Sequence, residues 1–386
     1  MKLAIELKNS IALSLLLGLS VITGLSQALP VSGLYNHEVA VGNESDSERD
    51  RAFSEALSAV IVKVTGARHW LEEPVIATAL RNAQNYVEGF DYRTEIVVAD
   101  LEEVSDDQAQ PQTEPQTQPQ TQVTVSTVEQ NFINVIFASD LVDDLLASAN
   151  VPVWDSNRPS VLVWMVLQND QGERALLTED ISAEVLSTMR QFAEERGLPI
   201  IFPVLDFEDR RNLDADTVWT LDEEAISLAS VRYGADSILA GRLHFTTSGE
   251  LVGLWQFIFQ DEVEIFDGLD TELTSYLFQP LDRITSQLAN HFAIVRTDIG
   301  TQRVRVRVEG IKNLTAYTAL LSYVQNLGLV VRVSTALLDG ESLELELSLS
   351  GDSEQLNELI ALDRDLLPLS SSLAASQSVL HYRWTR

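Results

Sequence analysis

The sequence predicts three small domains that mix α/β and α+β structure. Apolar residues switch repeatedly between the period of a helix and the alternation of a strand, as in mixed folds. A length of 386 residues, 45% of them hydrophobic, allows two or three cores of ordinary size. The chain has no cysteine, so these cores form without disulfides or thiolate metal sites. The predicted boundaries are 1–28 for a signal peptide and 29–150, 151–298 and 299–386 for the domains.

The first 28 residues predict an export signal. Lys2 and Lys8 precede an apolar run that ends at Leu25, and Ser26-Gln27-Ala28 has the small-x-small pattern of a cleavage site. The run is shorter than the roughly 20 apolar residues that span a bilayer, and no later segment reaches that length without charges. We therefore expect a periplasmic location and no transmembrane segment after cleavage.

The first domain, residues 29–150, is predicted to be α+β. Its main helix carries apolar residues at i, i+3, i+4 and i+7 from Phe53, and Gly66 ends it. Ser47 and Asp50 form the predicted N-terminal cap. The other predicted elements are strand 34–42, a helix that begins at Pro74, strands 92–98 and 131–137, and a helix over 140–150.

A Gln/Thr/Pro-rich stretch over about 104–124 interrupts this domain between its last two strands. Its few apolar residues cannot offset the entropy of ordering the chain. We expect a disordered loop, and the alternative that its prolines bind a partner rests on a motif that is common in linkers.

The second domain, residues 151–298, is predicted to begin with a stiff junction and to continue as α/β. Pro152 and Pro159 restrict the backbone on either side of Trp154 and Arg158. The apolar run that follows is typical of a strand buried on both faces. The predicted elements are strands 161–167, 199–204, 237–245 and 251–260, a helix from 181 to Gly197, a helix over 222–233, and a helix that Pro280 opens.

The third domain, residues 299–386, has the predicted order strand, helix, strand, strand, helix, strand. This βαββαβ order is the split βαβ of ferredoxin-like domains, a scaffold that hosts many functions. The predicted elements are strand 303–308, helix 314–327, strands 330–334 and 343–350, helix 354–361 and strand 379–384.

Several motifs together resemble an exported proteobacterial family, the domain of unknown function family numbered 2066. The Gln/Thr/Pro loop departs from that family's pattern, and the resemblance implies no catalytic residues. The motifs are Glu48–Phe53, Val62–Gly66, Pro152–Trp154, Asn157–Pro159, Leu205–Asp209 and Arg232–Arg242.

The middle domain also looks like the N-terminal domain of the translocation protein TolB. Gly234-Ala235-Asp236 leads into a strand that ends at Gly241-Arg242, and the order of the elements agrees. Modules of this kind bind proteins, so the resemblance implies a partner rather than a substrate.

Two groups of residues are candidates for partner binding. Trp154, Asn157 and Arg158 combine the residue types that dominate protein interfaces, although a Trp that seals two domains explains them equally well. Arg303, Arg305 and Arg307 alternate along one strand and therefore share one face. That stripe suits either an acidic partner or the protein's own acidic face.

One acidic loop has the spacing of a calcium site. Its oxygen donors fill positions 1, 3, 5 and 12 of a calcium-loop frame, but Thr217 stands at position 6 where the turn favours Gly. A solvated acidic loop is the simpler interpretation, with ion pairs from Asp206, Glu208 and Asp209 to Arg210, Arg211 or Arg158. The candidate ligands are Asn212, Asp214, Asp216 and Glu223.

The remaining patterns exclude more than they identify. A net charge of −32 repels phosphate backbones, so nucleic acid is not an expected partner. No nucleophile elbow, phosphate loop or dinucleotide fingerprint is present, and we predict no cofactor. The sequence favours a periplasmic, non-enzymatic adaptor or assembly factor that binds envelope proteins. A small-ligand or Ca²⁺ binding protein and an unrecognised hydrolase are the alternatives, and the oligomeric state is not predicted.

Overall fold

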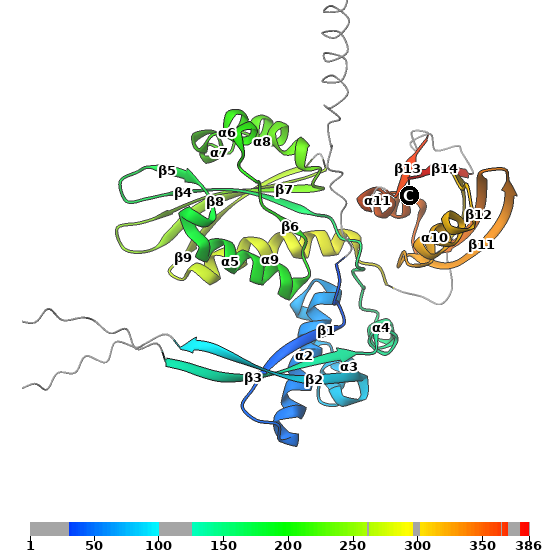
Figure 1. Cartoon of the computed structure of the whole chain (residues 1–386), viewed down its shortest axis with the longest axis horizontal. Helices are drawn as coiled ribbons and strands as arrows, with labels where there is room; N and C mark the ends of the chain where they lie inside the picture. Colours follow the sequence, from blue (N-terminus) through cyan, green and yellow to red (C-terminus); the bar gives the residue numbers. More distant parts are fainter. Residues whose placement is uncertain are drawn as a thin grey trace, which may run out of the picture.

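The computed structural model describes residues 31–99, 126–260, 262–295, 302–363, 365–369 and 379–385. The predicted export signal and the Gln/Thr/Pro loop lie outside these residues. Within them, three sheets and ten α-helices confirm the predicted mixed α/β and α+β class (Figure 1). No helix in this described part is long and apolar enough to cross a membrane.

The N-terminal domain is a three-stranded antiparallel sheet in the order β1-β3-β2, packed against the long helix α2. Ser45 caps α2 by accepting a hydrogen bond from the Glu48 N–H at 3.4 Å, so the predicted cap at Ser47 and Asp50 was wrong by a few residues. Gly66 ends α2 with φ 71°, as predicted. The elements are β1 (Asn36–Val41), α2 (Asp46–Thr65), α3 (Pro74–Leu80), β2 (Val87–Ala99), β3 (Ser126–Phe137) and α4 (Ser139–Ser148).

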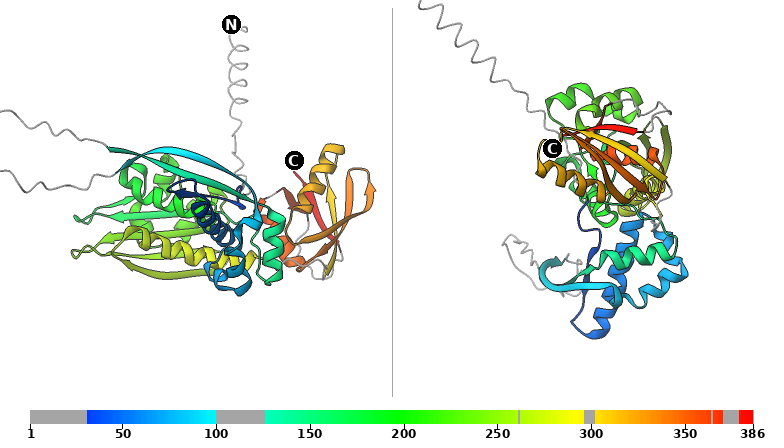
Figure 2. Two further views of the ribbon diagram at one scale, coloured as in Figure 1. Left: turned by 90° about the horizontal axis from the view of Figure 1, so that it is seen from below. Right: turned by 90° about the vertical axis from the view of Figure 1, so that its right-hand side faces the viewer.

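Strands β2 and β3 are much longer than their sequence patterns predicted. They stay in antiparallel register from Gly89 opposite Ile136 to Ala99 opposite Ser126. In Figures 1 and 2 this pair projects past α2 as a two-stranded arm. The residues that the prediction missed are 87–91 at the inner end of β2 and 126–130 at the outer end of β3.

The middle domain is a six-stranded mixed sheet in the order β5-β4-β7-β8-β9, with β6 also paired to β4. β4 runs parallel to β6 and β7, and the other pairs are antiparallel. The elements are β4 (Val161–Gln168), β5 (Arg174–Leu176), α5 (Glu179–Arg196), β6 (Ile200–Ile201), α6 (Phe207–Asn212), α7 (Ala215–Trp219), α8 (Glu223–Ser230), β7 (Ser237–Phe245), β8 (Leu251–Phe259), β9 (Glu262–Asp270) and α9 (Leu273–Phe292).

Helices cover both faces of this sheet, as the continuous apolar run in β4 predicted. Val163 and Met165 pack with residues of α5 and α9, whereas Trp164 and Val166 pack with residues of the α6–α8 layer. Trp164 is fully buried, and its Nε1 donates to Ser230 Oγ at 2.9 Å.

Several features of the middle domain differ from the sequence prediction. The predicted strand 199–204 is a strand only at Ile200–Ile201, and helices α6 and α7 were not predicted. The two short or exposed strands β5 and β9 were not predicted, because in β9 the alternate residues Val263, Ile265 and Leu269 face solvent. Pro280 lies inside α9 rather than at its start. Its ring is buried in the apolar stripe of the helix, and that packing offsets the backbone hydrogen bond that proline removes.

The C-terminal domain contains the predicted split βαβ unit, with β12 paired between β10 and β11. An additional strand, β13, pairs with β14, and β14 runs parallel to β10. Because β13 intervenes, the last strand joins β10 in parallel, whereas the predicted ferredoxin-like order has an antiparallel strand there, so that part of the prediction was wrong. The elements are β10 (Gln302–Glu309), α10 (Leu314–Gln325), β11 (Val330–Asp339), β12 (Ser342–Leu349), α11 (Ser353–Asp363), β13 (Leu366–Pro368) and β14 (Val379–Trp384).

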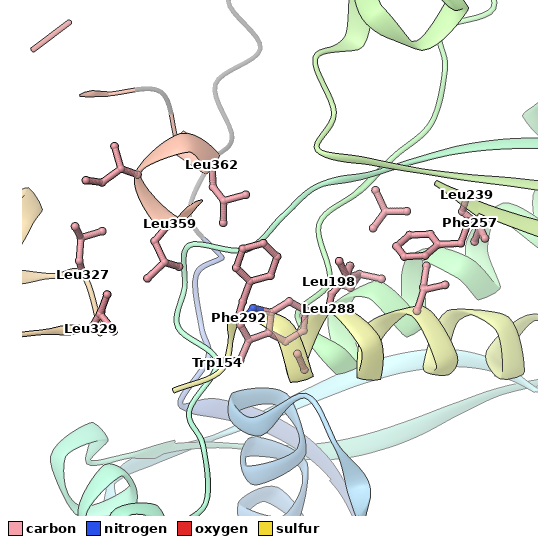
Figure 3. Packing of buried hydrophobic residues seen from close by; sticks show 14 of the residues in the cluster. Trp154, Leu198, Leu239, Phe257, Leu288, Phe292, Leu327, Leu329, Leu359 and Leu362 are labelled. Carbon is pink, nitrogen blue, oxygen red and sulfur yellow. The ribbon is translucent and has the colours of Figure 1, made fainter. Parts of the chain in front are cut away.

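The middle and C-terminal domains share one cluster of buried side chains. Figure 3 shows Trp154 and Phe292 between Leu359 and Leu362 on one side and Leu198 and Leu288 on the other. Such a shared apolar contact restricts the motion of the two domains relative to each other.

Gly253→Ala should destabilise the middle domain by about 3 kcal/mol. A Cβ at this position of β8 would overlap the main-chain oxygen of Arg242 and the hydroxyl of Tyr276, and the backbone oxygen cannot move aside cheaply. Urea unfolding followed by tryptophan fluorescence measures the loss. Gly89→Ala is the matched control, because no atom lies within 4 Å of the added methyl group. Equal stability of the two variants would contradict this packing.

Candidate functional site at the domain junction

The residues from Val151 to Pro159, here called the junction segment, contact all three domains. Trp154 N–H donates to Val64 O of α2 at 2.7 Å, and Val153 exchanges two 2.9 Å hydrogen bonds with Ile294 just after α9. Asn157 Nδ2 donates to Leu359 O of α11 at 2.8 Å. A segment that is hydrogen-bonded to every domain fixes their arrangement.

Arg158 is the centre of this segment. Its side chain is 2% exposed, and each of its five N–H donors has a partner. The acceptors are all main-chain carbonyl oxygens: those of Asp155 (2.8 Å), Arg196 (3.0 Å), Gly197 (3.0 Å), Lys63 (2.8 Å) and Trp154 (2.8 Å). The planar fork of a guanidinium is the one side chain that can serve five such acceptors.

Three of these carbonyls belong to the C-terminal ends of two helices. Lys63 lies in the last turn of α2, while Arg196 and Gly197 end α5. Carbonyls at a helix end lack helical partners and carry the negative end of the helix dipole. Burial lowers the pKa of Arg158 to about 9, so the group remains charged at neutral pH. The buried cation therefore satisfies two helix ends at once.

Two further cations lie beside Arg158. Arg196 is 1% exposed, donates from Nη2 to Gly66 O at 2.6 Å and forms an ion pair with Asp282. Burial lowers its pKa, and Asp282 opposes that effect. Lys63 is 8% exposed, and its Nζ donates to the carbonyl oxygens of Gly33 and Asn36 at 3.3 and 3.2 Å.

Trp154 packs closely against the end of α2. The Arg158 guanidinium carbon lies 4.2 Å from the centre of the Trp154 ring, in cation–π geometry. A Cβ at Gly66 would lie 2.8 Å from Trp154 Cε3, and the φ of 71° also disfavours any other residue. Gly66 thus allows the chain to turn at the end of α2 and leaves room for the Trp154 ring to pack there.

These positions settle how the candidate residues of the junction are used. Trp154 is fully buried and Arg158 is almost fully buried. The side-chain amide of Asn157 donates a hydrogen bond to the carbonyl oxygen of Leu359. Trp154 and Arg158 have no surface with which to touch a partner protein. Of the two interpretations that the sequence left open, the structure supports the one in which Trp154 seals two domains.

The arginine stripe lies on one face of β10, as the alternation predicted. Arg305 is opposite Glu346 and Arg307 is opposite Glu344 in the antiparallel register with β12. The distances from the arginine nitrogens to the carboxylate oxygens are 3.9 Å for Arg303 with Glu346, 3.8 Å for Arg305 with Glu346 and 3.6 Å for Arg307 with Glu344. The stripe therefore meets the protein's own acidic face.

The acidic loop is folded into three short helices rather than into one calcium-loop frame. Its four candidate ligands are distributed over α6, α7 and α8, because Asn212 ends α6, Asp214 caps α7 and Glu223 begins α8. Asp214 Oδ1 accepts from the Thr217 N–H at 2.8 Å, and Asp216 pairs with Arg174 at 2.8 Å. No metal-binding group of His, Cys, Asp or Glu occurs among the residues that the structure describes.

The neighbouring carboxylates form ion pairs, as predicted, but with a different arginine. Arg232 Nη1 lies 2.8 Å from Asp206 and 2.9 Å from Asp209, and 3.7 Å from Glu208. The hydrogen bond from Arg232 holds the pKa of Asp206 well below its usual range. Tyr233 also donates to Asp209, and burial raises the pKa of this tyrosine to about 12.

An exposed group of apolar side chains surrounds these ion pairs, and the sequence analysis did not identify it. Val204, Phe207, Leu228 and Val231, here called the apolar patch, are 76%, 82%, 75% and 73% exposed. The Val204 N–H donates to the Tyr233 hydroxyl at 2.9 Å, which brings the loop after β6 beside the end of α8. The sequence could not reveal that these side chains are exposed, because an apolar residue normally predicts burial.

Comparison with known proteins assigns no activity. Residues 28–155 match the model of a domain of unknown function, DUF8605. The resemblance to family 2066 was therefore wrong, and the likeness to the TolB N-terminal domain is not retained. No curated protein matches. One solved structure, described as "Crystal structure of uncharacterized protein", is 9% identical, with 35% of this chain and 92% of that chain covered. Its TM-score of 0.17 supports no argument about the fold.

Arg158→Met should lower the free energy of unfolding by about 3–5 kcal/mol, because buried carbonyls at two helix ends lose their donor. Arg158→Lys should lose part of that energy, since an ammonium has three donors where the guanidinium has five. Urea unfolding measures both. Arg305→Met, at a side chain that is 57% exposed, is the control and should change stability by less than about 0.5 kcal/mol. Wild-type stability of Arg158→Lys would refute the proposed role of the fork.

Asp214→Ala should cost about 1 kcal/mol, because α7 loses its N-terminal cap. Asp214→Asn should retain wild-type stability, since the amide oxygen still accepts the Thr217 N–H. Addition of CaCl2 should leave the melting temperature of both variants and of the wild type unchanged. A rise in the wild type that is absent in Asp214→Asn would restore the calcium interpretation.

Proposed function

We propose that this chain is a periplasmic, non-enzymatic adaptor or assembly factor of the cell envelope that binds a partner protein through the apolar patch. The predicted export signal supports the location. The exposure of four large apolar side chains on α6, on α8 and on the residues next to these helices supports the binding role, because exposed apolar surface marks interaction sites.

The net charge of the chain favours a cationic partner. The chain as a whole carries a charge of −32, and Glu224 is exposed on α8 four residues before Leu228, whereas Asp206 and Glu208 are already paired with Arg232. Complementary charge steers association, while the apolar side chains supply affinity. The partner segment therefore combines lysine or arginine with apolar residues.

The patch is held on a rigid support. Leu205 has a left-handed φ of 54°, and its side chain is buried between the exposed Val204 and Phe207. Asp209 Oδ2 accepts the Leu205 N–H at 2.9 Å, and Arg232 ties Asp206 to the neighbouring helix end. A non-glycine residue with positive φ persists only where its surroundings enforce it. A preformed surface loses little entropy on binding.

A photo-crosslinking amino acid at position 207 in the exported protein should capture one reproducible envelope protein in living cells. The same amino acid at position 314 is the control, because Leu314 is 75% exposed but lies in the C-terminal domain. Cell fractionation should recover the product from the periplasm. Capture at both positions with the same pattern, or recovery from the cytoplasm alone, would contradict the proposal.

Phe207→Ser combined with Leu228→Ser should weaken binding of the captured partner at least tenfold and leave the melting temperature within about 2 °C, because neither side chain contributes to a core. Isothermal titration calorimetry with the purified partner measures the affinity. Leu314→Ser is the matched control and should bind like the wild type. Unchanged affinity of the double variant would move the interface away from the patch.

A further inference from the structure

A pocket of about 510 Å³ lies between the N-terminal and middle domains, on the α5 side of the middle sheet and away from the apolar patch. The chain before β1 and the last turn of α2 form one wall. The end of α5 and the segment through β6 form the other. A volume of this size is typical of sites for small ligands.

Lys63 is a buried cation on the wall of this pocket. Its Nζ donates to two carbonyl oxygens at 3.2 and 3.3 Å, which leaves one of the three ammonium N–H groups without a partner in the hydrogen bonds of the described residues. No carboxylate oxygen in the described part of the chain lies within 4.0 Å of this nitrogen. A buried ammonium without an anionic partner is costly, and an anion in the pocket relieves that cost.

Cations and carboxylates are mixed around the pocket, because Glu194 lines it and Glu195 also acts on the charge of Lys63. Arg190 also lines the pocket, where its guanidinium lies 5.5 Å from the Phe202 ring and pairs with Glu179 at 2.7 Å. Arg158 lies directly behind the wall, 2.9 Å from the position of a Cβ on Gly197. Glu194 is the one carboxylate among the lining residues, so the pocket favours a single negative charge over two.

Part of the wall is apolar. Val31, Leu198, Ile200 and Phe202 line the space next to the charged groups, and Ser32 and Asn36 add polar side chains. Contact between the apolar side chains and the apolar part of a ligand removes apolar surface from water, which is favourable. The Lys63 ammonium binds the charged end of the ligand. Because Arg190 is already paired with Glu179, Lys63 beside these apolar side chains differs from a phosphate site, which offers several donors and little apolar surface.

We propose that the pocket binds a small monocarboxylate with an apolar body, with the ligand carboxylate against Lys63. Because the two walls belong to different domains, the bound ligand stabilises their docking as well as its own position. The site is independent of the apolar patch, so either proposal can fail without the other.

The test uses the full mature chain with lysine labelled at the ε-carbon with ¹³C, and hexanoate as the probe. After residue 28 the sequence contains two lysines, Lys63 and Lys312, so the carbon spectrum shows two side-chain signals, of which Lys312 is the internal control. Hexanoate should shift the Lys63 signal saturably and leave the Lys312 signal unchanged. Hexanol should shift neither, because it has the same body without the charge.

Lys63→Met identifies the signal and should weaken hexanoate binding about tenfold in calorimetry, whereas Lys312→Met should bind as the wild type does. If Lys63→Met fails to fold, the wild-type titration still decides the outcome. No saturable shift, an equal shift of both lysines, or a shift with inorganic phosphate but not hexanoate would overturn the proposal. Tighter binding of a peptide through its C-terminal carboxylate would overturn the small-molecule assignment.

Discussion

The arrangement of the first two domains depends on one guanidinium placed where two helices end. A buried charge loses several kcal/mol of hydration, and Arg158 recovers that loss through five carbonyl oxygens that would themselves be unpaired without it. The glycines at the ends of α2 and α5 turn the chain away at that point, which allows both helix ends to approach the same side chain. Trp154 and the shared apolar cluster then extend the fixed arrangement toward the C-terminal domain.

The parts of the fold that sequence reasoning predicted are those whose cause is local. Gly66 ends α2 because its own backbone adopts a left-handed conformation, and the apolar run of β4 predicts burial on both faces. Pro280 misled the prediction because a proline usually marks the start of a helix, whereas here tertiary packing carries α9 through it. Strand β13 is three residues long and is defined by its pairing with β14, so no local pattern reveals it.

The candidate sites show the same division. The sequence singled out the junction segment by residue type, but three of the carbonyl oxygens that Arg158 binds belong to residues 63, 196 and 197, which only the fold brings together. The calcium frame rested on spacing alone, whereas in the structure this loop folds into three short helices in which Asp214 is a cap and Asp216 forms an ion pair. Arg232 was missed as the partner of Asp206 because it is 26 residues away, and nearer arginines were available.

The position of Arg158 also bears on how the chain folds. All five donors of the Arg158 guanidinium are paired only when α2 and α5 have both formed and docked. A state in which one of the two domains is folded alone therefore holds a buried charge that lacks some of its hydrogen-bond acceptors. Such half-folded states are raised in free energy relative to both end states. The two domains are consequently expected to behave as one cooperative unit despite their separate sheets, with a single transition where the sequence boundaries suggest two.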